Sequence, residues 1–322
     1  MSIAPTIAAF EALLAEIPYP RIDPVLIGPV RWYGVTYIMA FGLAYLVLRF
    51  LSKRGRWPVH PDRVGDVLFW GILGVFLGGR IGYMIAYAEN KSFGEWFNVR
   101  QGGMAFHGGL AGVVLAYFTY ALVKKIRFRD LLDGLALATA PGIFCVRIAN
   151  FINAELVGRP WDGPWAMKFP LYKIGQEDKF TWDTVARHPS QLYQALGEGL
   201  IHFAILYWLM IKKSWGGGRI AAAFLVIYGT LRFVTEFFRE PDPQLGYQWL
   251  GMTRGQEFCV AMVVLGLVCF LLFRLVKSRN MPVIDWSKAG PNGEPPSAPP
   301  AVPPAVPPPV APGDGTGEAP AA

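Results

Sequence analysis

Long apolar stretches separated by short polar connections dominate the chain. Seven runs approach the roughly 20 residues that an α-helix needs to cross the hydrocarbon core of a bilayer; they cover residues 30–51, 67–87, 106–123, 131–152, 192–211, 220–238 and 258–276. Several of them contain glycine, which membrane helices use for close packing. The pattern predicts an all-α, polytopic membrane protein with seven transmembrane helices.

Basic residues gather in alternate connections, after the first, third, fifth and seventh runs. They are Lys53, Arg54, Arg56 and Arg63; Lys124, Lys125, Arg127 and Arg129; Lys212, Lys213 and Arg219; and Arg274, Lys277 and Arg279. Because positive loops stay in the cytoplasm, the N-terminus is predicted to be periplasmic and the C-terminus cytoplasmic. Residues 153–189 then form a small periplasmic segment. This divides the chain into an N-terminal periplasmic segment (1–29), a seven-helix transmembrane domain (30–280) and a cytoplasmic tail (281–322).

The composition agrees with a membrane protein. Of the 322 residues, 53% are hydrophobic and only 16% are charged, whereas a soluble domain has about 25% charged residues. The three cysteines lie in apolar runs, so they predict neither a disulfide framework nor a metal site. The tail is different: 13 of its last 41 residues are proline, and such a segment cannot bury a core and is predicted to be disordered.

The end of the fourth run carries polar side chains where lipid favours apolar ones. Arg147, Asn150 and Asn153 are three residues apart and share one helix face. Polar groups at membrane depth usually face a bundle interior or a water-filled cavity. Glu155 is eight residues beyond Arg147, about two helical turns away. The arginine and the glutamate are therefore predicted to have different partners.

The sixth run holds Arg232, Glu236 and Arg239, which also share one helix face. Glu236 can neutralise one of these arginines within the helix. The second arginine remains in excess, and a spare guanidinium facing a cavity suits a phosphate group.

Four other positions leave structural and functional interpretations open. Tyr33 fits an interfacial aromatic belt or a direct role. Arg80, followed by Tyr83, either serves the site or extends its charged end to the interface. His107 lies between glycine pairs that allow close approach of backbone or substrate, and an imidazole there can act as a base. His188 begins a His-Pro-Ser sequence that suits a helix entry as well as a substrate contact.

Together, these positions predict an anionic headgroup site that opens to lipid. The chain has no Ser/His/Asp arrangement, no metal-ligand spacing, no phosphate-binding loop and no dinucleotide fingerprint. Nothing in it suggests nucleic-acid binding. A transporter or flippase would share the intramembrane arginines, but it would predict an inverted repeat and interrupted helices, which the sequence does not show. A purely structural scaffold would leave the surplus arginines unexplained.

At these residues the sequence resembles bacterial phosphatidylglycerol–prolipoprotein diacylglyceryl transferases. Six segments occur in the family's order between about residues 30 and 245. They are Trp32-Tyr33-Gly34; Gly78-Gly79-Arg80-Ile81-Gly82-Tyr83; Gly102-Gly103-Met104-Ala105-Phe106-His107-Gly108-Gly109; the residues Arg147, Asn150, Phe151, Ile152, Asn153, Glu155, Gly158 and Arg159; Arg187-His188-Pro189-Ser190-Gln191-Leu192-Tyr193; and the residues Arg232, Glu236, Phe237, Phe238, Arg239, Pro241 and Asp242.

The resemblance implies a multi-pass enzyme of the bacterial inner membrane with a periplasmic N-terminus. It implies transfer of the diacylglyceryl group of phosphatidylglycerol to the lipobox cysteine in a prolipoprotein signal peptide, with formation of a thioether and release of glycerol 1-phosphate. It implies no metal and no cofactor. The expected partners are phosphatidylglycerol, prolipoproteins and the surrounding membrane lipid.

Charge and resemblance together assign roles to the site residues. We expect Arg147 and Arg232 to bind the headgroup and stabilise the leaving phosphate, and His107 to be the base for the cysteine thiol. Glu155 and Glu236 are expected to position arginines, although either could be the base instead. The full set of expected substrate-binding residues is Tyr33, Arg80, Tyr83, Asn150, Asn153, Glu155, Glu236 and Arg239.

The departures from the family pattern are concentrated at the end of the fourth run. Val146, Ala149 and Ala154 stand where the family usually or often has glycine, and Gln194 stands where it often has glutamate. The polar residues of the pattern are all present. We therefore expect a change in how closely this helix end packs rather than a loss of activity.

Overall fold

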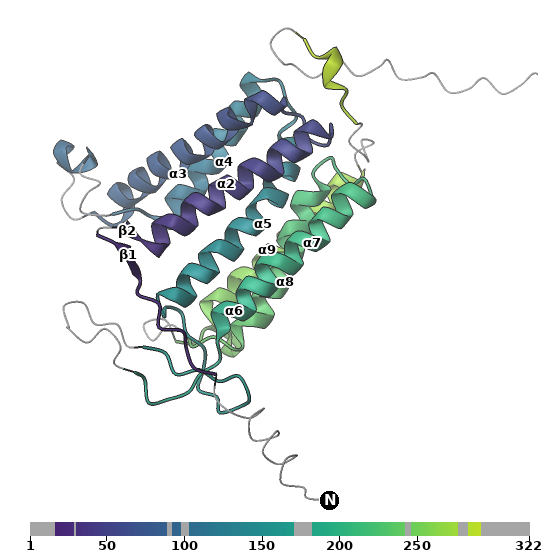
Figure 1. The fold of residues 1–322 in the computed structure, drawn as a ribbon. Coiled ribbons are helices and arrows are strands. Elements are labelled where there is room, and N and C mark those ends of the chain that lie inside the picture. Colours follow the sequence, from purple (N-terminus) through teal and green to yellow (C-terminus); the bar gives the residue numbers. More distant parts are fainter. Residues whose placement is uncertain are drawn as a thin grey trace, which may run out of the picture.

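The apolar runs form long helices that lie side by side. The computed structural model describes residues 17–28, 30–88, 92–97, 103–170, 182–241, 246–275 and 283–290. In these residues a small hairpin of β1 (Val25–Ile27) and β2 (Val30–Arg31) leads into α2 (Trp32–Lys53), and the chain continues mainly as helix, with irregular residues 154–170 and 182–189 between α5 and α6 (Figure 1). The all-α prediction is confirmed apart from this hairpin.

The remaining long helices follow the predicted runs closely. They are α3 (Val64–Ala86), preceded by the short η1 (Pro61–Arg63); α4 (Phe106–Val123); α5 (Phe128–Ile152); the continuous helix formed by α6 (Ser190–Gln194), η4 (Ala195–Ile201), α7 (His202–Tyr207) and η5 (Trp208–Lys212); α8 (Arg219–Glu236); and α9 (Arg254–Leu275). Short turns of helix are η2 (Phe93–Phe97), η6 (Trp249–Gly251) and η7 (Trp286–Lys288).

Six of the described helices are long and apolar enough to cross a membrane: Trp32–Lys53, Pro61–Ala86, Phe106–Val123, Phe128–Ile152, Ser190–Lys212 and Arg254–Leu275. The sixth predicted run forms α8, which carries Arg219, Arg232 and Glu236 within its 18 residues. These charges lower its apolar character, so α8 is confirmed as a helix but is not among the six.

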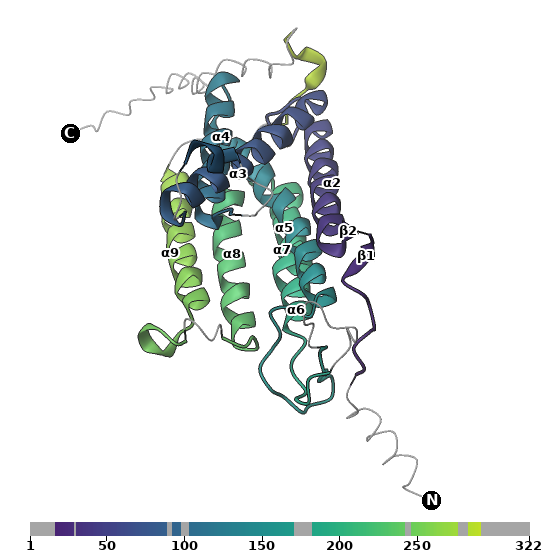
Figure 2. The same cartoon turned by 90° about the vertical axis from the view of Figure 1, so that its left-hand side faces the viewer.

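Helices α3 and α4 meet along a seam of glycines. A Cβ atom added to Gly78 would lie 2.3 Å from the carbonyl oxygen of Gly108, and one added to Gly112 would lie 2.2 Å from that of Gly74. Real side chains do not fit at such distances, so only glycine allows the two backbones to come this close. The pair consequently forms one wall of the bundle (Figure 2).

The helix from Ser190 to Lys212 contains two π-helical segments, Ala195–Ile201 and Trp208–Lys212. A π-helical turn widens an α-helix and is frequent at functional sites. The first segment packs against both α5 and α8, and Figure 1 shows α6, α7 and α8 beside α5. It therefore places Glu198, which is fully buried, between these helices.

Asp133 joins α5 to the start of α8. Its side chain is fully buried and accepts hydrogen bonds from the backbone amides of Gly218 (2.8 Å) and Ala221 (2.9 Å). These amides have no partner inside their own helix. A carboxylate on one helix thus caps another, which fixes their relative position at this end.

Residues 283–290 lie against the connection after α2, at the end of the bundle opposite residues 154–170 and 182–189 (Figure 1). The latter residues are named the outer segment after the side of the membrane that the loop charges predict for them. Trp286 Nε1 donates to the carbonyl of Ser52 (2.7 Å), and the amide of Ile284 donates to that of Gly55 (2.9 Å). The sequence predicts that residues 283–290 belong to a disordered tail. Hydrogen bonds hold them against the bundle, whereas the rest of that tail, residues 281–282 and 291–322, lies outside the described residues.

Candidate active site

A buried glutamate holds the two predicted arginines together. The Nε and Nη2 atoms of Arg147, on α5, lie 3.2 and 2.9 Å from Glu198 Oε2. The Nε atom of Arg232, on α8, lies 3.8 Å from Glu198 Oε1. Thr235 donates its hydroxyl to the same oxygen at 2.8 Å. Because Glu198 is fully buried, these partners are what makes an intramembrane carboxylate tolerable.

The second glutamate extends this cluster toward the end of α8. Glu236 contacts Arg232 within one helical turn, its Oε1 lies 3.5 Å from Arg239 Nη1, and it accepts the hydroxyl of Thr253 at 3.1 Å. The predicted pairing of Glu236 with an arginine is thus confirmed. The cluster contains three arginines (Arg147, Arg232 and Arg239) and two glutamates (Glu198 and Glu236), so its formal charge is +1. The sequence predicts the same surplus of one arginine for the sixth run.

Glu155 belongs to a different cluster. It accepts the Tyr33 hydroxyl at 3.2 Å and lies 3.5 Å from Asn150 Nδ2, which also donates to the Tyr33 oxygen at 2.5 Å. Asn150 and Arg147 stand one turn apart on α5. The expectation that Arg147 and Glu155 have separate partners is confirmed, and the two clusters lie at successive levels of one helix face.

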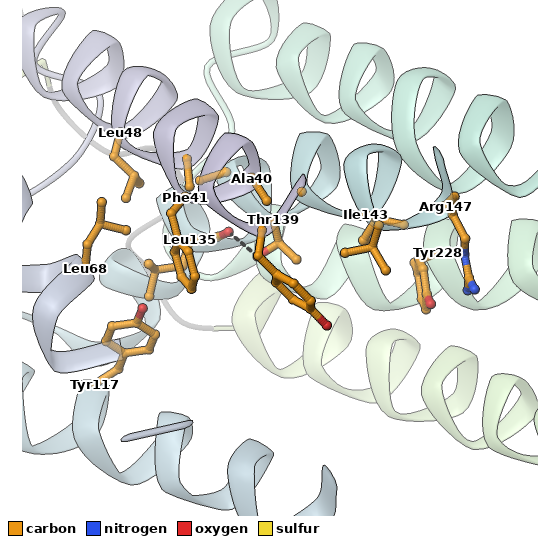
Figure 3. A pocket seen from close by; sticks show the side chains of 15 residues that line it. Ala40, Phe41, Leu48, Leu68, Tyr117, Leu135, Thr139, Ile143, Arg147 and Tyr228 are labelled. Carbon is orange, nitrogen blue, oxygen red and sulfur yellow. Dashed lines mark hydrogen bonds between the residues drawn. The ribbon is translucent and has the colours of Figure 1, made fainter. Parts of the chain in front are cut away.

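An apolar cavity leads to Arg147. It has a volume of about 430 Å³ and runs between α2 and α5, with contributions from α3, α4 and α8. In Figure 3, Leu48, Leu68 and Tyr117 lie toward one end, whereas Arg147 and Tyr228 project side by side at the other. The cavity therefore has an apolar end and an end with a guanidinium group, an arrangement that complements the acyl chain and the anionic phosphate of a phospholipid.

Arg80 donates hydrogen bonds to backbone carbonyls and packs on Tyr83. The guanidinium of Arg80, on α3, donates to the carbonyls of Trp96 (3.2 Å) and Gly103 (2.9 Å) and to that of Glu95. It lies 5.4 Å from the ring centre of Tyr83. These contacts hold the connection between α3 and α4, a role that the interfacial interpretation did not include.

Among the contacts of the described residues, no hydrogen bond joins His107 or Asn153 to Arg147 or Arg232. His107, in the first turn of α4, contacts the ring of Phe258 on α9 at 6.3 Å between centroids. Asn153 is the C-terminal cap residue of α5. The structure thus puts His107 beside α9.

His188 lies in an aromatic group of the outer segment. Its ring stacks on Trp161 at 4.2 Å, and Nδ1 lies 3.2 Å from the hydroxyl of Tyr193, which accepts from Trp165 Nε1 at 2.6 Å. Burial among these rings lowers the pKa of His188. The group orders the entry into α6, as the structural interpretation of His-Pro-Ser indicated.

Three positions that depart from the family pattern lie in different surroundings. Val146 lines the cavity and Ala149 is fully buried. Ala154 has φ of +51°, a left-handed conformation that favours glycine. The chain therefore has a strained position just before Glu155.

Sequence reasoning missed Glu198, Tyr228 and Thr235. A usable signal was present for Glu198, because an acidic residue between Gly197 and Gly199 interrupts the fifth apolar run. Tyr228 precedes Arg232 by one turn, but aromatic residues are common in such runs. In the described residues, no group of three or more His, Cys, Asp or Glu could hold a metal ion.

Comparison with known proteins matches the chain to one family. The family model described as prolipoprotein diacylglyceryl transferase matches residues 24–272. A phosphatidylglycerol–prolipoprotein diacylglyceryl transferase of Idiomarina loihiensis is 43% identical over 261 residues, which cover 78% of this chain and 92% of the relative. One of Rhodospirillum rubrum is 41% identical over 281 residues, with 84% and 99% covered.

Proposed function

The chain belongs to the prolipoprotein diacylglyceryl transferase family, and we propose that the Arg147–Glu198–Arg232 cluster is where it carries out the family's reaction. The enzyme transfers the diacylglyceryl group of phosphatidylglycerol to a cysteine thiol of a prolipoprotein. A carbon–oxygen bond to phosphate breaks and a carbon–sulfur bond forms. The thiol proton passes to a base, and glycerol 1-phosphate leaves with the electron pair of the broken bond.

The donor lipid is proposed to bind with its phosphate at the arginines and an acyl chain in the apolar cavity. The observation that carries this proposal is that Arg147, at the end of an apolar cavity, shares the carboxylate of Glu198 with Arg232 from a second helix. Fixed cations aimed at the developing phosphate charge can contribute on the order of 3 kcal/mol each to lowering the barrier. The remaining positive charge of the cluster suits a phosphate diester.

Other residues are proposed to orient the headgroup and activate the thiol. Tyr33, Asn150 and Glu155 form one hydrogen-bonded group on the outer side of Arg147, which suits the glycerol hydroxyls. His107 is proposed as the base, because a thiol must lose its proton to be a good nucleophile. The proposed rim of the donor site consists of Arg80, Tyr83, Asn153, Glu236 and Arg239.

We also propose that α8 is a seventh transmembrane helix and that the protein lies in the bacterial inner membrane. The outer segment (154–170 and 182–189) and η7 lie at opposite ends of the bundle (Figure 1), as an odd number of crossings requires. The loop charges put the η7 end in the cytoplasm, which makes the N-terminal segment and residues 153–189 periplasmic. A lipobox cysteine would therefore meet the site from the periplasmic side.

Release of glycerol 1-phosphate tests this function. The purified protein, in phosphatidylglycerol vesicles, is expected to release glycerol 1-phosphate only when a peptide with a lipobox cysteine is added, and in amounts equal to the thioether formed. A transporter or flippase would move labelled phosphatidylglycerol without releasing the phosphate ester. A Cys→Ser acceptor peptide is the matched control. Release that is independent of the thiol would contradict the proposed reaction.

A further inference from the structure

We propose that Glu198 is a positioning residue that sets the spacing and orientation of Arg147 and Arg232 for the leaving phosphate. This inference rests on the proposed function of the two arginines. Glu198 is not itself a lining residue of the cavity, and among the described contacts it meets that lining through Arg147. It acts through its partners, and for that reason it is not a catalytic residue itself.

The carboxylate divides its two oxygens between the two arginines. Oε2 receives the Nε and Nη2 atoms of Arg147, while Oε1 faces Arg232 and the hydroxyl of Thr235. A planar guanidinium held along its Nε–Nη2 edge cannot rotate freely. The remaining Nη1 group of Arg147 is thereby directed away from Glu198, and Figure 3 shows this guanidinium beside Tyr228 at the cavity end.

The local fold is built to bring Glu198 between α5 and α8. It lies in the π-helical segment Ala195–Ile201. At Gly199, a Cβ atom would lie 2.6 Å from the Cβ of Phe144, one turn before Arg147 on α5. The absence of a side chain there lets α5 approach closely enough for Arg147 to reach the carboxylate.

The charge of Glu198 is needed because two guanidinium groups repel each other strongly in a medium of low dielectric constant. Glu236 contacts Arg232 and Arg239 but not Arg147 in the described contacts. Without Glu198, Arg147 would lose its carboxylate partner and turn away from Arg232. The phosphate would then meet one well-placed arginine rather than two.

The test begins with Glu198→Gln, which keeps the shape and removes the charge. We expect kcat for transfer to fall about 30-fold, because a preorganised electrostatic contact is lost, while the KM for phosphatidylglycerol changes about threefold or less, since the headgroup still meets Arg232. Glu198→Asp should recover part of the lost kcat. The control is Asp133→Asn, which alters another fully buried carboxylate, distant along α5 and outside the site. It should lower the thermal midpoint without lowering kcat per folded molecule.

A double-mutant cycle separates positioning from general stability. If Glu198 acts through Arg147, Glu198→Gln added to Arg147→Lys should lower kcat by about threefold or less, because neighbouring residues that work together are not additive. A full, multiplicative loss would overturn the proposal. So would wild-type kcat in Glu198→Gln when Arg147→Ala is inactive, an outcome that leaves the proposed function intact. If Arg147→Ala kept wild-type transfer, the proposed function itself would fail.

If Glu198→Gln does not fold, Thr235→Val tests the positioning role of Glu198 instead. It removes one hydroxyl donor from Glu198 and nearly preserves side-chain volume. A fall in kcat of roughly three- to tenfold, the range for one neutral hydrogen bond, supports the positioning role. Unchanged kcat in this variant would overturn it.

Discussion

The glycine next to Glu198 offers a sharp test of how helix spacing controls the site. Gly199→Ala adds one methyl group where α5 is closest. Its Cβ would lie 2.6 Å from Phe144 Cβ, 2.9 Å from Phe144 Cα and 3.1 Å from the Phe144 amide nitrogen. None of these atoms belongs to the far end of a flexible side chain. The helix must therefore move.

The size of that movement follows from ordinary contact distances. Carbon atoms prefer separations of about 3.5–4.0 Å, so α5 has to move by about 1 Å at Phe144. Arg147 lies one turn further along the same helix and would draw away from Glu198. A misplacement of about 1 Å can lower a rate about 100-fold. The overpacking costs about 1–3 kcal/mol of stability, partly offset by about 1 kcal/mol because alanine favours a helix over glycine.

Gly197→Ala is the matched control, since it makes the same chemical change on the other side of Glu198. The nearest atom to its Cβ would be Thr235 Cγ2 at 3.8 Å, an ordinary contact. We expect transfer within about twofold of wild type and a stability equal to or about 1 kcal/mol above it.

The assay is transfer from phosphatidylglycerol vesicles to a lipobox peptide, with thermal unfolding measured on the same samples. Gly199→Ala should lose far more activity than its fall in folded fraction explains. Equal activity of the two alanine variants would refute the reasoning, because the close contact with α5 would then not matter for the arginine.

Three other changes test the framework around the site. Asp133→Ala should lower the free energy of unfolding by about 2–6 kcal/mol, measured by denaturation in detergent, because each of two buried amides of α8 left unpaired costs about 1–3 kcal/mol; a change below about 1 kcal/mol would contradict the capping role. Tyr19→Phe should destabilise the protein by about 1–2 kcal/mol, since its hydroxyl donates to the carbonyls of Phe151 (2.6 Å) and Ile152 (3.0 Å) at the end of α5; an unchanged thermal midpoint would show that water replaces it. Because burial lowers the pKa of His188, its unfolded form binds protons more readily, so stability should be complete above about pH 6.5 and fall below it. His188→Phe should make the thermal midpoint depend less on pH in that acidic range. An unaltered pH dependence would show that other groups cause it.

Much of the fold can be predicted from the sequence, because membrane helices are recognised by the length and composition of their apolar runs. Runs 106–123 and 131–152 correspond to α4 and α5 within a few residues. The spacing of Arg147 and Asn150 also predicted a shared face correctly. Run length and side-chain spacing are local properties of the sequence. The bilayer makes them reliable signals, because polar groups in its interior are costly.

The partners of the polar groups could not be derived in this way. Arg147 pairs with Glu198, 51 positions later, and helical spacing says nothing about which of several helices comes next to α5. Arg80 was assigned to substrate or to the interface, but backbone carbonyls of a connection satisfy it. A carbonyl leaves no signal in a sequence, so such a partner is visible only in three dimensions.

The glycine seam between α3 and α4 has a consequence for how the protein enters the membrane. Consecutive helices whose backbones nearly touch can insert as one hairpin. Arg80, the most costly group of this hairpin, finds acceptors at Glu95, Trp96 and Gly103, all of them synthesised before α4 is complete. The nascent chain therefore carries the partners of its own arginine into the bilayer, and this half of the bundle can assemble before the helices bearing Glu198 and Arg232 leave the ribosome.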